Sequence, residues 1–425
     1  MHVLVLAALV LSAPKIWKDH DDRSALTSRV QTGDVNVDLP AFFNATLFAD
    51  LGNNARHIVV RDDGVVYVRL DQRGAPSQGY IVALRDTNGD GVADQERRFG
   101  RVPGTGITLH NGYLYYSSSD EVFRRKFTGS ELEPAGREQR IAKLPTQRSH
   151  AAKPVTIDEA GNLYVTVGAP SNACMKQART KGSAGLRPCP QLEEHGAIWR
   201  FDANRTGQPF AAAKKHAGGL RQVVALEWNP SARALFAVQH GRDQLNEFFP
   251  AIYSTLDSAE LPAEEFLRLD PGFVGGWPYT YYDWRVGKRM VAPEYGGNGK
   301  TPAEPGEYPE PEWAFPGHYG PNDLVFYTGN AFPKRYDGAA FIAFHGSWNR
   351  SPHGQRGYHV AVVPFSEGKA GRPFVFMDGF AGKTRLGSSR DALHRPTGLA
   401  VGPKGSLYVT DSRQGYVWKI DYVGE

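Results

Sequence analysis

The chain of 425 residues contains 41% hydrophobic and 22% charged residues, which is enough apolar sequence for a large folded core and argues against a disordered or fibrous protein. Its formal net charge is only +4, and basic residues are interspersed with acidic ones, so nucleic acid is not an expected partner. The 47 glycines and 29 prolines supply the many turns that an all-β fold needs.

One apolar run, from Val3 to Leu11, lies at the extreme N-terminus. We interpret residues 1–13 as a signal peptide, although no Lys or Arg precedes the run. Residues 14–38 are then an N-terminal extension, and residues 39–425 are the folded domain. A periplasmic or secreted protein is expected. No later segment approaches the about 20 continuous apolar residues of a membrane span.

A short phrase recurs along the chain: apolar residues, a turn with Asp or Gly, and an alternating strand built around an aromatic residue. Each copy is typical of a β-hairpin. The six copies begin at Arg56, Gly106, Val155, Val224, Leu324 and Gly398, and the fifth continues through a longer loop to Ala340. This repetition predicts an all-β, six-bladed β-propeller of four-stranded antiparallel blades, with loop insertions on one face. A β-sandwich is the alternative, but it would not need six copies of one phrase.

Three further features complete the predicted ring. Residues 415–420 read as a strand, and residues 35–39 are expected to pair with it and close the ring. The segment between Asp243 and Trp313 is expected to form loops on one face rather than a domain. Cys174 and Cys189 lie in a polar loop and are expected to form a disulfide in an exported protein, the alternative being two free thiols.

Basic residues recur at the position where each inner strand would meet the channel mouth. They are Arg56, His150, Arg221, His318 and Arg395, whereas the second repeat has small residues at Gly104 and Gly106. Any one of them could be a solvated loop charge, but five at comparable positions favour a site for an anion. Arginine pairs with carboxylates through two parallel hydrogen bonds, so a planar ligand with several carboxylates would suit this ring.

Six stretches carry a family resemblance: Arg148–Gly168, Gly219–Gln222, Gln239–Asp243, Gly275–Tyr279, Phe344–Arg350 and Arg395–Ala400. Together they resemble the pyrroloquinoline-quinone-dependent glucose/sorbosone dehydrogenases, over about residues 39–421. The resemblance is strongest to the sorbosone-dehydrogenase-like branch, where the phrase Phe-His-Gly-Ser-Trp-Asn-Arg is a marker.

The resemblance assigns roles to individual residues. His150 matches the general base, and imidazole suits this task because its ordinary pKa of about 6.5 lies near working pH. The residues expected to bind the quinone cofactor are Arg221, Gln222, Trp277, Asn349, Arg350 and Arg395, with Arg56 added from the basic ring. The backbone carbonyls of His240 and Gly241 match those that hold calcium. Gln222 replaces an Asn, Asn349 replaces a Lys and Gly275 replaces a Tyr of the glucose-oxidising members.

A separate calcium signal is the segment Asp86-Thr-Asn-Gly-Asp-Gly-Val-Ala-Asp94. Asp86, Asn88, Asp90 and Asp94 place oxygen atoms at alternate positions, as calcium loops do. The twelfth position, which is a bidentate Glu in an EF-hand, is Arg97. A polar hairpin between two blade strands is an equal alternative.

These features predict an exported quinoprotein that oxidises a sugar or a sugar-derived aldehyde or alcohol, with pyrroloquinoline quinone and calcium as cofactors. The chain contains no haem-attachment, dinucleotide-binding or nucleophile-elbow motif, so a separate electron acceptor is expected, such as a quinone, a cytochrome or a dye. One alternative is a cofactor-free propeller that binds a carbohydrate or a protein. Another is a calcium-dependent lactonase, which the cationic strand starts disfavour. His353 and His359 are expected on the surface.

Overall fold

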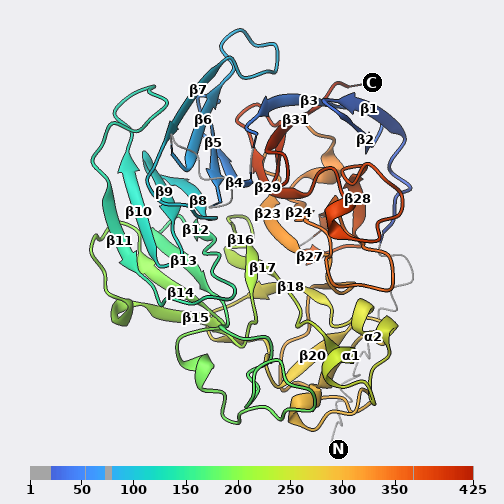
Figure 1. Ribbon diagram of the computed structural model, residues 1–425. Coiled ribbons are helices and arrows are strands. Elements are labelled where there is room, and N and C mark those ends of the chain that lie inside the picture. The colour runs from blue at the N-terminus through green and yellow to red at the C-terminus, as the bar shows by residue number, and fades with distance from the viewer. Residues whose placement is uncertain (1–20, 53, 72–78, 367, 425) are drawn as a thin grey trace, which may run out of the picture.

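The two strands of each repeated phrase are the inner two strands of one sheet. A computed structural model describes residues 21–52, 54–71, 79–366 and 368–424, so the predicted signal peptide lies outside the described residues. The six large sheets have four or five strands each, and Figure 1 shows them arranged radially about a common centre, which confirms the predicted six-bladed β-propeller. Within the described ranges, none of the helices has the length and apolar character needed to span a lipid bilayer.

The first three blades follow one another along the chain. Blade 1 contains β4 (Ala55–Val60), β5 (Val66–Leu70), β6 (Ile81–Arg85) and β7 (Gln95–Phe99). Blade 2 contains β8 (Ile107–His110), β9 (Tyr113–Ser117), β10 (Glu121–Lys126) and β11 (Gln139–Lys143). Blade 3 contains β12 (Val155–Ile157), β13 (Asn162–Val167), β14 (Ala197–Asp202) and β15 (Lys214–Gly218), extended by a parallel fifth strand, β19 (Phe273–Val274).

The last three blades continue in the same way, except that the outer strand of blade 6 comes from the N-terminal part of the chain. Blade 4 contains β16 (Val223–Asn229), β17 (Ala234–Gln239), β18 (Glu264–Leu269) and β22 (Trp313–Phe315). Blade 5 contains β23 (Pro321–Phe326), β24 (Ala340–Phe344), β25 (His359–Val363) and β28 (Phe374–Met377). Blade 6 contains β29 (Pro396–Val401), β30 (Leu407–Asp411), β31 (Tyr416–Tyr422) and β3 (Phe43–Asp50).

The ring closes through β3, not through residues 35–39 as predicted. β3 pairs antiparallel with β31 along its length, from Phe43 opposite Tyr422 to Asp50 opposite Tyr416. The segment Val35–Leu39 is β2 and pairs with β1 (Ser28–Thr32) in a separate hairpin. A local two-residue turn at Gly33 and Asp34 joins β1 to β2, so β2 is taken by its neighbour in sequence.

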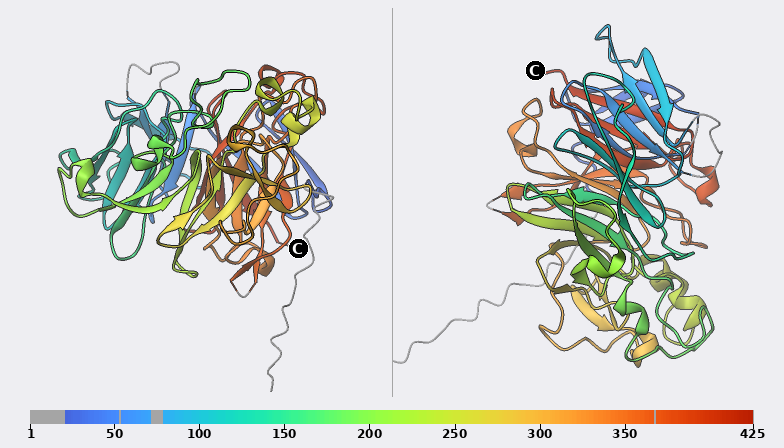
Figure 2. Two further views of the ribbon diagram at one scale, coloured as in Figure 1. Left: turned by 90° about the horizontal axis from the view of Figure 1, so that it is seen from below. Right: turned by 90° about the vertical axis from the view of Figure 1, so that its left-hand side faces the viewer.

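The segment between residues 243 and 313 differs from the predicted loops in two respects. It includes β18, which is the third strand of blade 4, and β19, which extends blade 3. The remainder is irregular, with α1 (Leu245–Phe248), α2 (Thr255–Glu260), the hairpin of β20 (Thr280–Asp283) and β21 (Lys288–Val291), and the short 3₁₀ turn Pro293–Tyr295. Figures 1 and 2 show this insertion gathered at one side of the ring.

The shorter elements lie in loops that connect the blade strands. Four further 3₁₀ turns occupy Pro190–Glu193, Phe210–Ala212, Lys334–Tyr336 and Ser389–Asp391, and β26 (Phe365–Ser366) pairs with β27 (Lys369–Ala370). His359, predicted on the surface, is the first residue of β25 and is only 1% exposed. Its place on an interior strand between β24 and β28 explains this difference.

The hydrophobic core lies between adjacent blades, because each strand alternates side chains toward the two neighbouring sheets. Trp418 on β31 is fully buried, in a cluster with Val37, Phe380 and Leu399 that joins the β1–β2 hairpin, blade 5 and blade 6. The closing sheet is therefore packed by residues from both ends of the chain.

Trp418→Ala should lower the free energy of unfolding by about 3–5 kcal/mol, because it leaves a large cavity where the ring closes. Denaturation in urea, followed by circular dichroism, measures this loss. Val423→Ala is the matched control, since Val423 is 67% exposed just beyond the same strand and should change stability little. Equal effects of the two substitutions would contradict this account of the core.

Candidate functional site

The predicted basic residues meet at one mouth of the channel. In each blade the inner strand starts at the same mouth, because the second strand returns to it and the third leaves from it. The loops that precede the inner strands and the loops between second and third strands therefore share this mouth. His150, Arg221, His318 and Arg395 lie in loops that precede inner strands, and Arg56 is the second residue of β4.

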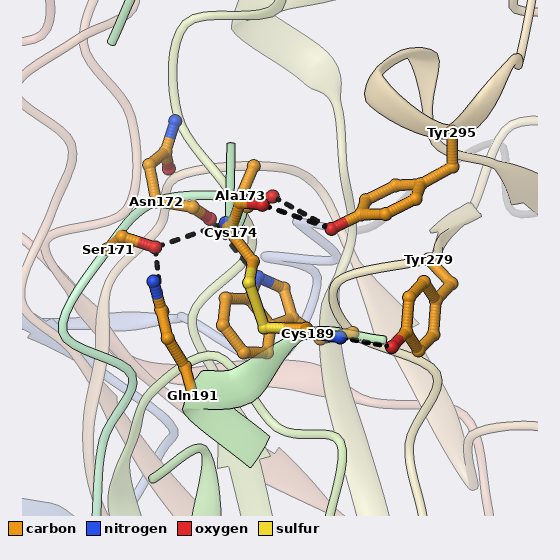
Figure 3. Close-up of a disulfide and its surroundings, with 9 residues drawn as sticks. Ser171, Asn172, Ala173, Cys174, Cys189, Gln191, Tyr279 and Tyr295 are labelled. Atoms are coloured by element: carbon orange, nitrogen blue, oxygen red, sulfur yellow. Dashed lines mark hydrogen bonds between the residues drawn. A yellow bond between two sulfur atoms is a disulfide. The ribbon is translucent and has the colours of Figure 1, made fainter. Parts of the chain in front are cut away.

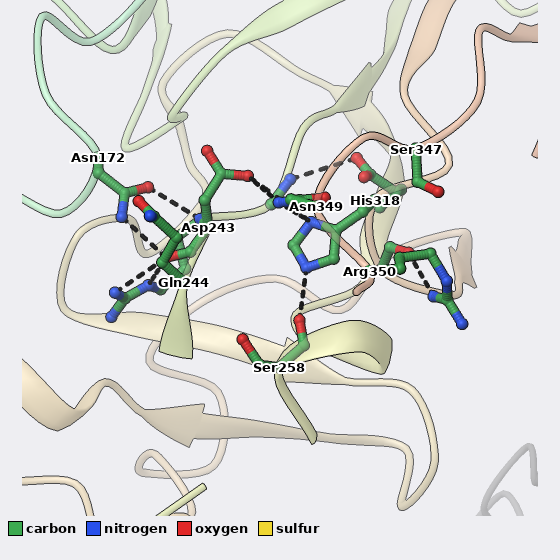
Figure 4. Close-up of polar contacts among 12 residues, drawn as sticks. Asn172, Asp243, Gln244, Ser258, His318, Ser347, Asn349 and Arg350 are labelled. Carbon is green, nitrogen blue, oxygen red and sulfur yellow. Dashed lines mark hydrogen bonds and ion pairs between the residues drawn. The ribbon is translucent and has the colours of Figure 1, made fainter. Parts of the chain in front are cut away.

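Asp243 is the counter-ion at the centre of this mouth, and the sequence analysis did not single it out. Its Oδ2 atom lies 2.6 Å from Nη2 of Arg221, and both side chains are largely buried. Its Oδ1 atom accepts a hydrogen bond of 2.8 Å from Nδ2 of Asn349 and lies 3.7 Å from Nδ1 of His318. Figure 4 shows Asn349 and His318 directed toward Asp243, with His318 bound in turn to the carbonyl of Ser258 at 2.9 Å.

The electrostatic environment keeps Asp243 ionised. Burial alone would raise the pKa of this carboxyl group, but the positive charge of Arg221 in particular holds it below its usual value. Burial lowers the pKa of Arg221 and of His318, and Asp243 opposes both shifts. One carboxylate therefore compensates a mouth that holds several basic groups.

The segment that leads into a disulfide-closed loop holds the backbone of Asp243. Asn172 donates from Nδ2 to the carbonyl of Asp243 at 2.9 Å and accepts from its N–H at 2.9 Å. Two residues later, Cys174 forms the predicted disulfide with Cys189 (Figure 3). The Trp277 indole donates to the carbonyl of Asn172 at 3.1 Å and packs against the disulfide. Trp277, predicted to contact the cofactor, thus supports the Asn172 loop.

His150 is held as a neutral imidazole with one fixed tautomer. Its Nδ1 atom lies 2.6 Å from the carbonyl of Ala169, so Nδ1 carries the proton and Nε2 carries the lone pair. Burial lowers the pKa of His150 to about 3, and the charge of Arg221 adds to this effect. The residue also adopts a left-handed backbone conformation, with φ of 56°, and Gln147 donates to its carbonyl at 2.9 Å. In this state the lone pair of Nε2 can accept a proton at neutral pH, but with a pKa of about 3 the ring is a weaker base than an ordinary histidine.

Three buried polar atoms near the mouth have no partner among the described residues: Nε of Arg221, Oε1 of Gln222 and Oδ1 of Asn349. Gln222 fits closely against blade 3, because a Cβ atom on Gly168 would lie 1.9 Å from its Oε1. Buried polar atoms of this kind are rare, and a bound polar ligand would satisfy them. All three belong to residues that the sequence assigned to the cofactor.

A second group of cations lies across the mouth from Asp243. A cavity of about 240 Å³ is lined by Asn54, Arg56, Asp71, His345, Arg395, Ser412 and Arg413. Burial lowers the pKa of Arg395 to about 10, and Arg413 and Arg56 contribute to this shift. Arg395 is fixed by hydrogen bonds to the carbonyls of His345 at 2.9 Å and Gly346 at 2.6 Å. Three guanidinium groups and one carboxylate, that of Asp71, leave this cavity with an excess of positive charge, which favours an anionic ligand.

Arg350 does not join either group. Its guanidinium donates to the carbonyls of Ala259, Gly317 and Gly354 and to the carboxylate of Glu260, and the residue is 1% exposed. These acceptors use its donor atoms and anchor the blade 5 loop to α2. The structure therefore gives Arg350 a supporting position, one residue from Asn349, which does reach the mouth.

The two predicted calcium sites differ in their surroundings. His240 and Gly241 follow β17 and lead directly to Asp243, with Nε2 of His240 2.8 Å from the carbonyl of Pro321. The Asp86–Asp94 loop connects β6 to β7 and so lies at the opposite end of its blade. Asp86 and Asp90 accept hydrogen bonds from the N–H groups of Gly89, Gly91 and Val92, and Asp94 from that of Thr87, as in a polar hairpin. In the described part of the chain, no three His, Cys, Asp or Glu side chains are grouped as metal ligands.

The chemistry of the mouth fits an anionic cofactor with several carboxylates. Arg56, Arg395 and Arg413 offer positive charge around a cavity, and the unpartnered atoms of Arg221, Gln222 and Asn349 offer polar contacts. Sequence patterns did not indicate Asp243, Asn172 or Arg413, which lie in loops outside the repeated phrase. Asp243 is nonetheless the last residue of Gln239–Asp243, one of the six stretches that carry the family resemblance.

Comparison with known proteins gives enzymes of sugar oxidation as partial sequence matches. A family model described as TrAA12-like matches residues 278–423. A pyrroloquinoline quinone-dependent pyranose dehydrogenase from Coprinopsis cinerea is 33% identical over 117 residues, which are 24% of this chain and 15% of that protein. An uncharacterized protein of Borreliella burgdorferi is 24% identical over 330 residues, which are 75% of each chain.

Solved structures share the whole fold. The holo pyrroloquinoline quinone domain of the Coprinopsis cinerea pyranose dehydrogenase has a TM-score of 0.71 and 19% identity, covering 92% of this chain and 98% of its own. The calcium structure of a Trichoderma reesei enzyme of carbohydrate-active family AA12 has a TM-score of 0.74 and 18% identity, covering 93% and 99%. The chain therefore shares its propeller fold with quinone-dependent sugar dehydrogenases and AA12 enzymes.

Asp243→Ala should lower the free energy of unfolding by about 3 kcal/mol or more, because it leaves Arg221 buried without its counter-ion. Urea denaturation measures the change. The matched control is Asp270→Ala, since the ion pair of Asp270 with Arg268 is exposed and should contribute less than about 1 kcal/mol. If Asp243→Ala were as mild as the control, Asp243 would not be the counter-ion of the mouth.

His150 should remain neutral between about pH 8 and about pH 5, because its pKa lies near 3 rather than near 6.5. In ¹⁵N-histidine NMR spectra, the resonances lost in His150→Gln should show protonated Nδ1 and no titration in this range. Between about pH 8 and about pH 5, His150 takes up a proton in the unfolded chain but not in the folded protein. This residue therefore makes the fold less stable as pH falls from about 6.5. A titration midpoint above about pH 6 would refute the neutral base.

Proposed function

We propose that this chain is a pyrroloquinoline-quinone- and calcium-dependent dehydrogenase for a sugar or a sugar-derived aldehyde or alcohol, of the sorbosone or aldose kind. The observation that carries the proposal is the pairing of a neutral His150 with an arginine-rich mouth. There, one buried polar atom each of Arg221, Gln222 and Asn349 has no partner among the described residues. The shared fold with quinone-dependent sugar dehydrogenases supports it.

Different residues of the mouth would bind different parts of the cofactor. Arg56, Arg395 and Arg413 would pair with carboxylates of the cofactor, and Arg221, Gln222 and Asn349 would contact its other polar atoms. The backbone carbonyls of His240 and Gly241 would hold calcium beside Asp243, since calcium prefers oxygen ligands. When bound, pyrroloquinoline quinone supplies an electrophilic carbon that accepts a hydride from the substrate.

His150 would act as the general base. Its Nε2 atom accepts the proton of the substrate hydroxyl, while Nδ1 stays bound to the carbonyl of Ala169 and fixes the ring. Its low pKa makes the proton easy to release afterwards, so the neutral form returns for each turnover. Arg221 beside it disfavours the imidazolium ion and speeds this return.

An exported location would suit the disulfide between Cys174 and Cys189, because disulfides persist in oxidising compartments. The lactonase alternative needs several carboxylates around one metal, and the described residues contain no such group. The cofactor-free binding module is the remaining alternative, and the binding experiment below separates it from the dehydrogenase.

Isothermal titration of the purified protein with pyrroloquinoline quinone, with and without calcium, tests the cofactor site. We expect calcium-dependent binding that Arg395→Ala weakens about 10-fold to 100-fold, because a charge-assisted pair is lost. Arg233→Ala is the control, since Arg233 is exposed in the turn between β16 and β17 at the other end of blade 4. No binding to the unmodified protein would favour the cofactor-free module.

Dye reduction with a panel of aldoses and sorbosone tests the catalytic role. His150→Ala should bind the cofactor but lose at least about 100-fold in kcat, because general bases contribute about 10²-fold to 10⁴-fold. His353→Ala is the control, because His353 lies in the blade 5 loop, where it contacts Thr255. Full turnover by His150→Ala would remove His150 from the mechanism.

A further inference from the structure

The disulfide loop that holds Asp243 also presents a strongly basic outer surface. Between Cys174 and Cys189 the chain has four cations, Lys176, Arg179, Lys181 and Arg187, and no Asp or Glu. All four are exposed. The chain as a whole has 49 basic and 45 acidic residues, so this loop is a local concentration of positive charge. We call the segment 174–189 the basic loop.

The described contacts of these cations leave their charge largely uncompensated. Arg179 donates to the side-chain oxygen of Gln244, which is uncharged. Arg187 lies over the ring of Tyr279, at 4.5 Å from its centroid. Lys176 and Lys181 extend from exposed positions of the loop. A surface of this kind attracts an acidic partner over distances of about a Debye length.

The basic loop is held rigidly. Besides the disulfide, the N–H of Lys176 donates to the carbonyl of Ala184 at 2.8 Å, and the N–H of Gly182 to the carbonyl of Phe248 at 2.9 Å. The hydroxyl of Tyr279 accepts from the N–H of Cys189 at 2.9 Å, and Tyr295 donates to the carbonyl of Cys174 at 3.3 Å (Figure 3). Fixed charges lose little conformational entropy when a partner binds.

The basic loop borders the channel mouth. Asn172, two residues before it, is bound to the backbone of Asp243, and Arg179 is bound to Gln244, the next residue. Arg179 is also among the cations that keep the pKa of Asp243 low against the effect of burial. Trp348 adds an aromatic anchor: it is 59% exposed and adjoins Asn349, which is bound to Asp243. Exposed tryptophans flanked by charge are typical of binding hot spots.

We propose that the basic loop and Trp348 form the docking surface for an acidic electron-transfer protein, which takes electrons at the channel mouth. This inference rests on the proposed dehydrogenase. Oxidation of one substrate releases two electrons and two protons. Two molecules of a one-electron acceptor each take one electron, and the protons pass to solvent. The position of the surface explains how a large acceptor can come close to a site that lies inside a channel.

The test compares two protein acceptors of similar size and opposite charge: oxidised plastocyanin, which is acidic, and oxidised mitochondrial cytochrome c, which is basic. In low salt, at about 0.01 M, the loaded enzyme should reduce plastocyanin at least about 10-fold faster, and raising salt to about 0.3 M should remove the advantage. No preference for plastocyanin at low salt would overturn the proposal.

Charge reversal locates the surface. The double variant Lys176→Glu with Lys181→Glu should lose about 10-fold or more in kcat/KM for plastocyanin, while its rate with an uncharged benzoquinone acceptor stays unchanged. The control is Lys334→Glu with Lys404→Glu, which makes the same charge change on exposed loops at the opposite end of the channel. Equal losses in both variants would show that only net charge matters and would overturn the docking surface.

A binding measurement separates this proposal from the proposed function. Zinc-substituted ¹⁵N-plastocyanin cannot accept electrons, so its chemical-shift changes on adding the protein report docking without turnover. Shifts that vanish in the Lys176 and Lys181 variant would support docking even if no sugar were oxidised. A change in the KM for the sugar, with plastocyanin binding intact, would instead assign the loop to the substrate and overturn the proposal.

Discussion

A single buried carboxylate makes the basic channel mouth possible. Positive charges repel one another strongly where water is excluded, and a buried guanidinium group such as that of Arg221 would destabilise the fold without a counter-ion. Asp243 lies between Arg221 from the loop before blade 4 and Asn349 from the loop of blade 5, and Asn172 from blade 3 fixes its backbone. Three consecutive blades thereby meet at one carboxylate.

The sequence predicted the six blades because each hairpin signal is local. The strand that closes the ring was predicted wrongly because pairing between chain ends is not local. Only the structure shows that β1 pairs with Val35–Leu39 and leaves Phe43–Asp50 to pair with β31. The structure explains why residues 106 and 398 are glycine, which the sequence did not reveal. A Cβ atom there would lie 2.3 Å from the carbonyl oxygen of Lys153 and 2.4 Å from that of Arg56, so these positions must be glycine.

Site residues that precede the inner strands of the repeat could be predicted from the sequence. Site residues in the loops outside the repeat could not. His150, Arg221 and Arg395 occupy equivalent positions before inner strands, which is why a common position located them. Asp243 and Asn172 lie in insertions, whose conformation depends on a disulfide and on distant partners. Arg350 shows a further limit, because neighbouring side chains point in different directions: Asn349 reaches Asp243, whereas Arg350 turns to the end of α2.

Closure of blade 6 by β3 has a consequence for synthesis. The chain is made from its N-terminus, so β3 emerges first among the blade strands, while its partner β31 ends at Tyr422 and emerges last. Until then, β3 has an unpaired edge, and Phe43 and Phe48, buried in the finished ring, lack their full set of neighbours. The nascent protein is therefore an incomplete ring whose exposed strand edge can pair with another chain. A chaperone that covers this edge until the ring closes would prevent pairing with other chains.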